Sequence, residues 1–155
     1  PARKTLKLID FGSARIASEP SCSASGTAGF CAPEVFTKGC SLSSDVFSAG
    51  VILYNSLTGD WPEPMQREAW MEVEDGDSAS AYRRVLESMA PAAVGCWLER
   101  APEAEIPGPA ALRSLLGRML HGLPSARPTA GRALDELRRA LAQGERAVAG
   151  SGATG

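Results

Sequence analysis

The sequence is poor in the features that mark several protein classes. It contains one histidine, His121, and its four cysteines form no C-x-x-C pair, so we expect no structural zinc site. Its formal net charge of −2 provides no basic surface for nucleic acid. No apolar run reaches the roughly 18 residues that a membrane span needs. We therefore expect neither a nucleic-acid partner nor a membrane partner.

The cysteine pattern and the first residues of the sequence indicate the cellular compartment in which we expect the protein. The cysteines are Cys22, Cys31, Cys40 and Cys96, and their spacing does not suggest a disulfide framework, so we expect reduced thiols. No secretory leader is evident in the sequence. Both observations favour an intracellular protein, with the cytoplasm as the expected compartment. A chain of 155 residues is at most one domain.

A strand and a loop are predicted in the first 29 residues. Leu6 and Leu8 alternate with Lys7, which is the period of a half-buried strand. Because strands do not stand alone, we expect its sheet partners to lie upstream. The tripeptide Asp10-Phe11-Gly12 ends the strand. Residues 13–29 are rich in Ser, Ala and Gly and are typical of a loop.

Four helices are predicted in the remainder of the chain. The first begins near Asp45, with Ser43 or Ser44 as cap and Gly59 as stop, and its apolar residues lie on all sides, which is typical of a helix inside a fold. The second covers 78–90. The third covers 109–120, with Pro109 at its first position. The fourth follows Thr129 and uses Leu134, Leu137 and Leu141, and residues 146–155 are predicted to be a disordered tail.

Four short motifs occur in a fixed order along these elements. The first is Asp10-Phe11-Gly12, whose carboxylate follows a strand and has the chemistry to hold a hard cation such as Mg²⁺. The others are Gly26-Thr27-Ala28-Gly29-Phe30-Cys31-Ala32-Pro33-Glu34, Asp45-Val46-Phe47-Ser48-Ala49-Gly50 and Arg127-Pro128-Thr129. A D-F-G tripeptide alone is weak evidence, since a turn aspartate after a strand is common. The ordered series resembles the C-terminal lobe of eukaryotic-type serine/threonine protein kinases, from Lys4 to Leu141.

The resemblance implies a mainly α fold: a kinase-like C-lobe with one or two short strands, an activation segment and about four helices. It implies ATP and Mg²⁺ as cofactors and a protein as substrate. Asp10 would bind Mg²⁺, Phe11 would pack toward the N-lobe, and Gly12 would allow the chain to turn. Residues 1–145 would then be a partial kinase domain.

The resemblance also implies roles for residues of the later motifs. Thr27 would contact the catalytic aspartate, and Gly29 with Phe30 would shape the pocket for the substrate residue after the acceptor. Asp45 would hold the catalytic loop through the N–H groups of its backbone. Glu34 would form a buried ion pair with Arg127. The form of the motif before Glu34 favours serine/threonine over tyrosine specificity.

The sequence departs from the family pattern in substitutions and in absences. Phe47 stands where the family usually has Trp, and Leu123 stands where an Asp often precedes Pro124. The 155 residues contain no Gly-rich loop, no strand lysine with its glutamate, and no H-R-D-x-x-x-x-N. The N-lobe and the catalytic loop are therefore absent, and with them the catalytic base. We expect the missing N-lobe of the same domain to be a binding partner of this chain. We also expect the chain alone to be inactive as a kinase.

Several features remain open between two interpretations. Ser21, Ser23 and Ser25 are candidate phosphorylation sites or part of a solvated loop. Trp61, Trp70 and Trp97 are more often packing anchors than binding platforms. For the whole chain, the first hypothesis is part of a kinase that transfers the ATP γ-phosphoryl group to protein Ser or Thr. The alternatives are a non-catalytic kinase-like scaffold and a truncated gene product.

Overall fold

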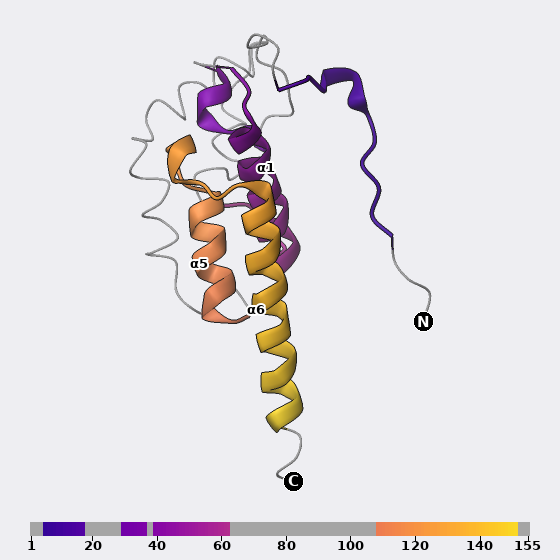
Figure 1. Cartoon of the computed structure of the whole chain (residues 1–155), viewed down its shortest axis with the longest axis vertical. Coiled ribbons are helices and arrows are strands. Elements are labelled where there is room, and N and C mark those ends of the chain that lie inside the picture. The colour runs from indigo at the N-terminus through magenta and orange to yellow at the C-terminus, as the bar shows by residue number, and fades with distance from the viewer. Residues whose placement is uncertain (1–4, 18–28, 37–38, 63–107, 152–155) are drawn as a thin grey trace.

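The computed structural model describes residues 5–17, 29–36, 39–62 and 108–151, and these residues are mainly helical. Their α-helices are α1 (Leu42–Thr58), α5 (Ala110–Met119) and α6 (Ala130–Ser151). The 3-10 turns η1 (Phe11–Ser13) and η2 (Pro33–Phe36) precede α1, and η4 (Pro124–Ala126) lies between α5 and α6. Figure 1 shows the three helices packed side by side, with α6 extending beyond the other two. The predicted helix at 78–90, Trp70 and Trp97 lie outside the described residues.

Helix α1 begins earlier than predicted because a reciprocal pair of serines fixes its start. Ser41 is the N-cap, not Ser43 or Ser44. The Ser41 N–H donates to Ser44 Oγ at 3.1 Å, and the Ser44 backbone N–H points back to the Ser41 side chain, so the two serines form a capping box. The predicted stop is confirmed: Gly59 has φ 77°, and its N–H donates to the Asn55 carbonyl at 2.8 Å.

The core lies where α1 meets α5. Phe47 and Val51 of α1 are fully buried against Leu116 of α5 and Leu120, the C-cap of that helix. Gly50 allows the close approach, since a Cβ there would lie 3.0 Å from Met119 Cβ. The buried face predicted for α5 is confirmed, and its members are Leu112, Leu115, Leu116, Met119 and Leu120. Pro109 is the N-cap of α5 rather than its first residue.

Helix α1 is not covered on every side in the described part of the chain. Leu42 and Ile52 are 72% and 55% exposed, and Asp45, Ala49 and Ser56 are exposed on the same helix face. The expectation of a fully enclosed helix is therefore wrong for these residues. Helices α5 and α6 cover one side only, so the outer side of α1 faces solvent.

Helix α6 is capped as predicted, and its predicted buried face is confirmed in part. The Arg132 N–H donates to Thr129 Oγ1 at 3.3 Å. Leu137 packs against the core as predicted. Leu134 and Leu141 are 46% and 53% exposed, and Ala133 and Ala140 are buried instead. The small alanines let α6 approach α5 closely, and the 3.6-residue period then turns Leu134 and Leu141 outward.

The C-terminal boundary of α6 corrects the predicted tail. The helix continues to Ser151, so residues 146–151, which we expected to be disordered, are helical. Ala147 and Ala149 are strong helix formers, and no proline follows to stop the helix. Residues 152–155 lie outside the described part.

The predicted strand around Leu6 and Leu8 is not formed within residues 5–17. Leu6, Leu8 and Ile9 are 89%, 78% and 83% exposed, and no strand is assigned in the described residues. A strand needs a neighbour for its backbone N–H and C=O groups, and no described segment provides one here. Figure 1 shows this indigo segment extending away from the helices. None of the described helices combines the length and the apolarity that crossing a bilayer requires.

Candidate functional site

Asp10 holds an unusual backbone conformation at the start of the η1 turn. Its φ is 61°, in the left-handed region that residues other than glycine seldom adopt. Its Oδ1 accepts the Gly12 N–H at 3.4 Å, a local bond that helps aspartate tolerate this region. Backbone strain of this kind clusters at functional sites. The local geometry therefore marks Asp10 as a candidate functional residue.

The carboxylate of Asp10 is a suitable ligand for Mg²⁺, but the described residues provide too few ligands for a complete metal site. A carboxylate oxygen is the ligand type that Mg²⁺ prefers. Within residues 5–17, 29–36, 39–62 and 108–151, no three Asp, Glu, His or Cys side chains gather where they could hold a metal ion. Phe11 beside it is 68% exposed, so its ring does not enclose the site. No catalytic step can be derived through a metal from these residues alone.

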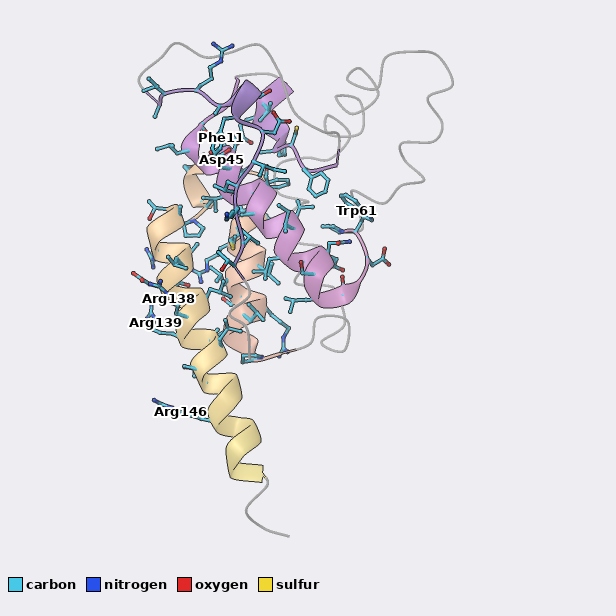
Figure 2. The ribbon with its side chains drawn as sticks, turned by 90° about the vertical axis from the view of Figure 1, so that its right-hand side faces the viewer. Phe11, Asp45, Trp61, Arg138, Arg139 and Arg146 are labelled. Atoms are coloured by element: carbon cyan, nitrogen blue, oxygen red, sulfur yellow. The ribbon has the colours of Figure 1, made fainter. Side chains whose placement is uncertain are left out.

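Gly29 and Phe30 meet an aromatic residue that the sequence did not single out for this place. Gly29 is buried with φ 85°, and the rings of Phe30 and Trp61 are in an edge-to-face arrangement with centroids 4.8 Å apart. Ser48 Oγ of α1 donates to the Phe30 carbonyl at 2.8 Å, which fixes the backbone of this segment on α1. Trp61 lies on the side of α1 that faces away from α6 (Figure 2).

Cys31 follows this pair and is buried in the core. Burial raises the pKa of its thiol, because the apolar surroundings disfavour the thiolate. A thiol without thiolate character is a poor nucleophile, so Cys31 serves packing here rather than chemistry.

The buried ion pair predicted between Glu34 and Arg127 is present. Arg127 Nη1 donates to Glu34 Oε1 at 2.7 Å, and Nη2 donates to Oε2 at 2.9 Å, across 93 residues of sequence. The two side chains are 0% exposed for Arg127 and 8% exposed for Glu34. This is the two-pronged geometry that a guanidinium offers a carboxylate. The pair ties η2 to the turn before α6.

Both members of this pair have further partners. Ser44 Oγ donates to Glu34 Oε1 at 2.8 Å. Arg127 also donates to three carbonyls, those of His121, Ser43 and Gly122, at 2.7, 3.1 and 3.3 Å. Its guanidinium lies 4.8 Å from the centroid of the Phe47 ring. No buried side-chain N or O atom in the described part of the chain lacks a hydrogen-bond partner, as a buried charge requires.

The electrostatics of Glu34 follow from these contacts. Burial by itself raises the pKa of its carboxyl, but hydrogen bonds from Arg127 and Ser44, together with the positive charge of Arg127, outweigh burial. The net result is a pKa below the ordinary value. The carboxylate therefore stays ionised at neutral pH, as the ion pair requires.

The remaining predicted site residues are only partly described. Asp45 lies in the first turn of α1 and is exposed; Figure 2 labels it beside the start of that helix. Thr27, Ser21, Ser23 and Ser25 lie outside the described residues. His121 follows α5, and its Nδ1 accepts the Leu123 N–H at 3.0 Å.

Two site residues were missed by sequence reasoning. The sequence predicts Ser44 only as a possible helix cap. The Ser41-x-x-Ser44 spacing is compatible with a capping box, but no sequence pattern places the Ser44 hydroxyl beside Glu34. Trp61 was weighed as a packing anchor, and no sequence pattern connects it with Gly29. Its position depends on the Gly59 turn that sends the chain back along α1.

Comparison with known proteins adds to this geometry. The family described as protein kinase domain matches residues 2–137. The chain is 42% identical over 64 residues to the probable serine/threonine-protein kinase zyg-1 of Caenorhabditis elegans, which covers 40% of this chain and 9% of that protein. It is 50% identical over 60 residues to human serine/threonine-protein kinase D3, which covers 37% of this chain and 7% of that protein. It is 44% identical over 61 residues to calcium-dependent protein kinase 6 of Plasmodium berghei, which covers 37% of this chain and 4% of that protein. The chain thus spans less than a tenth of each of these relatives.

Proposed function

Because this chain belongs to the protein kinase domain family, we propose that residues 1–145 are the C-lobe part of a serine/threonine protein kinase. The complete domain would transfer the γ-phosphoryl group of ATP, with Mg²⁺, to Ser or Thr of a protein substrate. Within it, these residues supply the D-F-G turn, the activation segment and the helices on the substrate side.

One observation carries the proposal: the buried pair of Glu34 and Arg127. Glu34 ends the Ala32-Pro33-Glu34 motif and Arg127 opens the Arg127-Pro128-Thr129 motif, and the two meet with both hydrogen bonds in place. The order of motifs along a sequence does not by itself show that the motifs meet in the folded chain. A buried ion pair between two of these motifs supports the proposal that they belong to one fold.

The roles of the other residues follow from the family pattern and remain part of the proposal. Asp10 would bind Mg²⁺, and Phe11 and Gly12 would shape the turn that presents it. Thr27 and Asp45 would support the catalytic loop. Gly29 and Phe30 would line the pocket for the substrate residue that follows the acceptor. The exposed positions of Asp10, Phe11 and Asp45 are consistent with surfaces that the rest of a kinase domain would cover.

These 155 residues do not supply a catalytic base. They contain no H-R-D-x-x-x-x-N, and the only histidine is followed by Gly122. Positioning and electrostatic stabilisation carry phosphoryl transfer, and both need groups from outside this sequence. We therefore propose that the N-lobe and the catalytic loop are required partners.

A second candidate is a kinase-like scaffold without chemistry. It is favoured by the absence, among the described residues, of any group of three or more Asp, Glu, His or Cys side chains that could hold a metal ion. The strained backbone of Asp10 argues the other way, because a scaffold has no need to keep an aspartate at φ 61°.

A phosphoryl-transfer assay separates these possibilities. We expect the purified 155-residue chain to transfer no radiolabelled phosphate from ATP to a Ser/Thr peptide mixture. Sequencing the transcript that encodes Pro1 should reveal H-R-D-x-x-x-x-N about 20 residues before Asp10, and the longer product should be active and lose activity in Asp10→Asn. Robust turnover by the short chain would refute the proposal, and an inactive longer product would favour the scaffold.

A further inference from the structure

We propose that the outward side of α6 is a docking surface for an acidic α-helix of a partner protein. This arginine face consists of Arg132, Arg138, Arg139 and Arg146. The inference goes beyond the proposed phosphoryl transfer, because it concerns the side of α6 that is turned away from the core.

The arginines of this face form a row along the helix. Arg132, Arg139 and Arg146 are spaced by seven residues, which is close to two helical turns, so their row is about 21 Å long. All four arginines of the face are exposed. Figure 2 shows Arg138, Arg139 and Arg146 on the side of α6 that is turned away from α1. Because α6 extends beyond α1 and α5 (Figure 1), a second helix has room to lie along it.

Two of the arginines have acidic neighbours that compensate their charge only in part. Arg132 Nε lies 3.0 Å from Glu136 Oε1, but the same carboxylate also pairs with Arg118 of α5. Arg138 Nη1 lies 3.9 Å from Asp135 Oδ1, and both side chains are about 70% exposed. An exposed pair at this distance is weak. These two arginines therefore keep positive charge that a partner can use.

The other two arginines are less compensated still. Arg139 Nε donates to the backbone carbonyl of Asp135 at 3.2 Å. Within the part of the chain that the structure describes, neither Arg139 nor Arg146 forms an ion pair. Like charges that gather on one side of a helix repel one another. Carboxylates of a partner relieve this repulsion, and a guanidinium binds each of them with two parallel hydrogen bonds.

The shape of the face favours a helix as the partner. Carboxylates at a seven-residue spacing on a second helix form a row with the same repeat as Arg132, Arg139 and Arg146. The exposed residue between Arg139 and Arg146 on this side is Ala142, whose small side chain lets a second backbone approach. The arginines can therefore contact the carboxylates of one acidic helix along the whole row.

A membrane surface fits this face less well. The exposed leucines of α6, Leu134 and Leu141, each stand five residues before an arginine of the face, Arg139 and Arg146. Residues five apart lie about 140° apart around a helix. A bilayer that contacts the arginines therefore receives no large apolar side chain from this face, and apolar insertion is what holds a helix in a membrane interface.

The test uses two fluorescent, alanine-rich helical peptides of about 21 residues. Both contain the same number of glutamates, which lie on one face in the first peptide and are distributed around the helix in the second. Each is titrated with the 155-residue chain, and its anisotropy is measured. We expect the one-faced peptide to bind about fivefold more tightly than the distributed peptide. Its affinity should fall as salt rises from about 0.02 M to about 0.2 M.

Variants locate the binding on α6. Arg139→Gln and Arg146→Gln should each weaken binding of the one-faced peptide about threefold, and both together about tenfold. Arg146→Lys should give a smaller loss than Arg146→Gln, because it keeps the charge without the planar fork. The matched control is Arg15→Gln, an equal change of charge at an exposed residue before α1, and it should leave binding unchanged. Far-UV circular dichroism shows that each variant keeps its helices.

Three results would overturn the inference. Equal affinity for the two peptides would mean that the chain responds to charge and not to a helix with one acidic face. Unchanged binding by the double variant would place the peptide elsewhere on the chain. Tighter binding to phosphatidylserine vesicles or to a single-stranded oligonucleotide, lost in the same double variant, would assign the arginine face to a membrane or to nucleic acid. None of these results bears on phosphoryl transfer, so the kinase proposal is tested separately.

Discussion

At the scale of single residues, Arg127 shows why this position requires arginine. Its guanidinium donates to both oxygens of Glu34 and to three backbone carbonyls. A lysine ammonium has three donors on a flexible stem and cannot reproduce a planar, two-pronged contact. The Arg127 guanidinium also lies over the ring of Phe47. Phe47 stands where the family usually has Trp, and its ring still provides a cation–π contact for Arg127.

The pair could be predicted from sequence, but the contact from Ser44 could not. Each charged residue is adjacent to a proline that restricts the chain, Pro33 before Glu34 and Pro128 after Arg127, and both belong to recognisable motifs. The Ser44 hydroxyl reaches Glu34 only because α1 begins at Leu42. A boundary error of three residues at the start of α1 was enough to hide this contact.

Leu123 offers a prediction at this scale. It is the N-cap of η4, makes no side-chain cap bond, and is 48% exposed. Leu123→Asp should raise the free energy of unfolding by about 0.5–1 kcal/mol, since an aspartate can accept a backbone N–H of the turn. Leu123→Ala is the control, because it removes the apolar side chain without adding a cap. Urea unfolding that gives equal values for the two variants would contradict the expectation.

At the scale of elements, two helix ends and the buried face of α5 were predicted correctly, whereas the start of α1, the end of α6 and part of the buried face of α6 were not. Gly59 and Thr129 were identified as stop and cap because their chemistry is local. The sequence predicts an inward face of α6 made of Leu134, Leu137 and Leu141. Only Leu137 packs against the core, and the buried residues of this face are Ala133 and Ala140. The prediction placed the most apolar residues of α6 in the core. In the structure, the small alanines are buried instead, because they fit where α6 packs against α5.

Two glycines give a prediction in which the same added methyl group has opposite effects. A Cβ at Gly59 or at Gly131 would meet nothing within 4 Å. Gly59 has φ 77°, so Gly59→Ala should destabilise the chain by about 1 kcal/mol. Gly131 lies in the first turn of α6, so Gly131→Ala should stabilise it by about 0.5 kcal/mol. Denaturant unfolding of both variants checks the signs, and a gain for Gly59→Ala would be incompatible with the described C-cap.

The contact between α5 and α6 predicts a pH dependence. Hydrogen bonds from Arg118, and then from Arg132, lower the pKa of Glu136 to about 2, against about 4.3 for an unperturbed glutamate in the unfolded chain. Because the folded pKa is depressed, this contribution is fully present above about pH 4.3 and is lost as the pH falls toward 2.

The measurement is the free energy of unfolding of the wild type and of Glu136→Gln between pH 2 and pH 6. The difference between the two should shrink as the pH falls through this window. Other carboxylates such as Glu34 titrate in both proteins and cancel from the difference to first order. A difference that stays constant with pH would mean that the Arg118–Glu136 contact does not perturb Glu136.

At the scale of the whole molecule, the order of the three described helices followed from the sequence. Two expectations that did not hold are the strand around Leu6 and the enclosure of α1. Both expectations required neighbours that the described residues do not provide: Leu6, Leu8 and Ile9 stay exposed, and Leu42 and Ile52 of α1 do too. An apolar pattern predicts that a surface will be covered, but the covering element has to come from elsewhere.

The central claim is that the Ala32-Pro33-Glu34 motif and the turn before α6 are joined inside one core, and a double-mutant cycle tests it most directly. Glu34→Gln and Arg127→Met are made singly and together, and urea unfolding is measured. Each single change should cost about 3–5 kcal/mol, because the remaining partner stays buried and uncompensated. Asp135 and Arg138, which lie 3.9 Å apart and are about 70% exposed, form the control pair and should show coupling of about 0.5 kcal/mol or less.

The account predicts that the double variant loses clearly less than the sum of the two single losses. If a single variant is unfolded without denaturant, recovery of a cooperative transition in the double variant gives the same answer. Mild, additive effects like those of the control pair would show that Glu34 and Arg127 do not meet in solution, and the kinase-like arrangement of this chain would then be wrong.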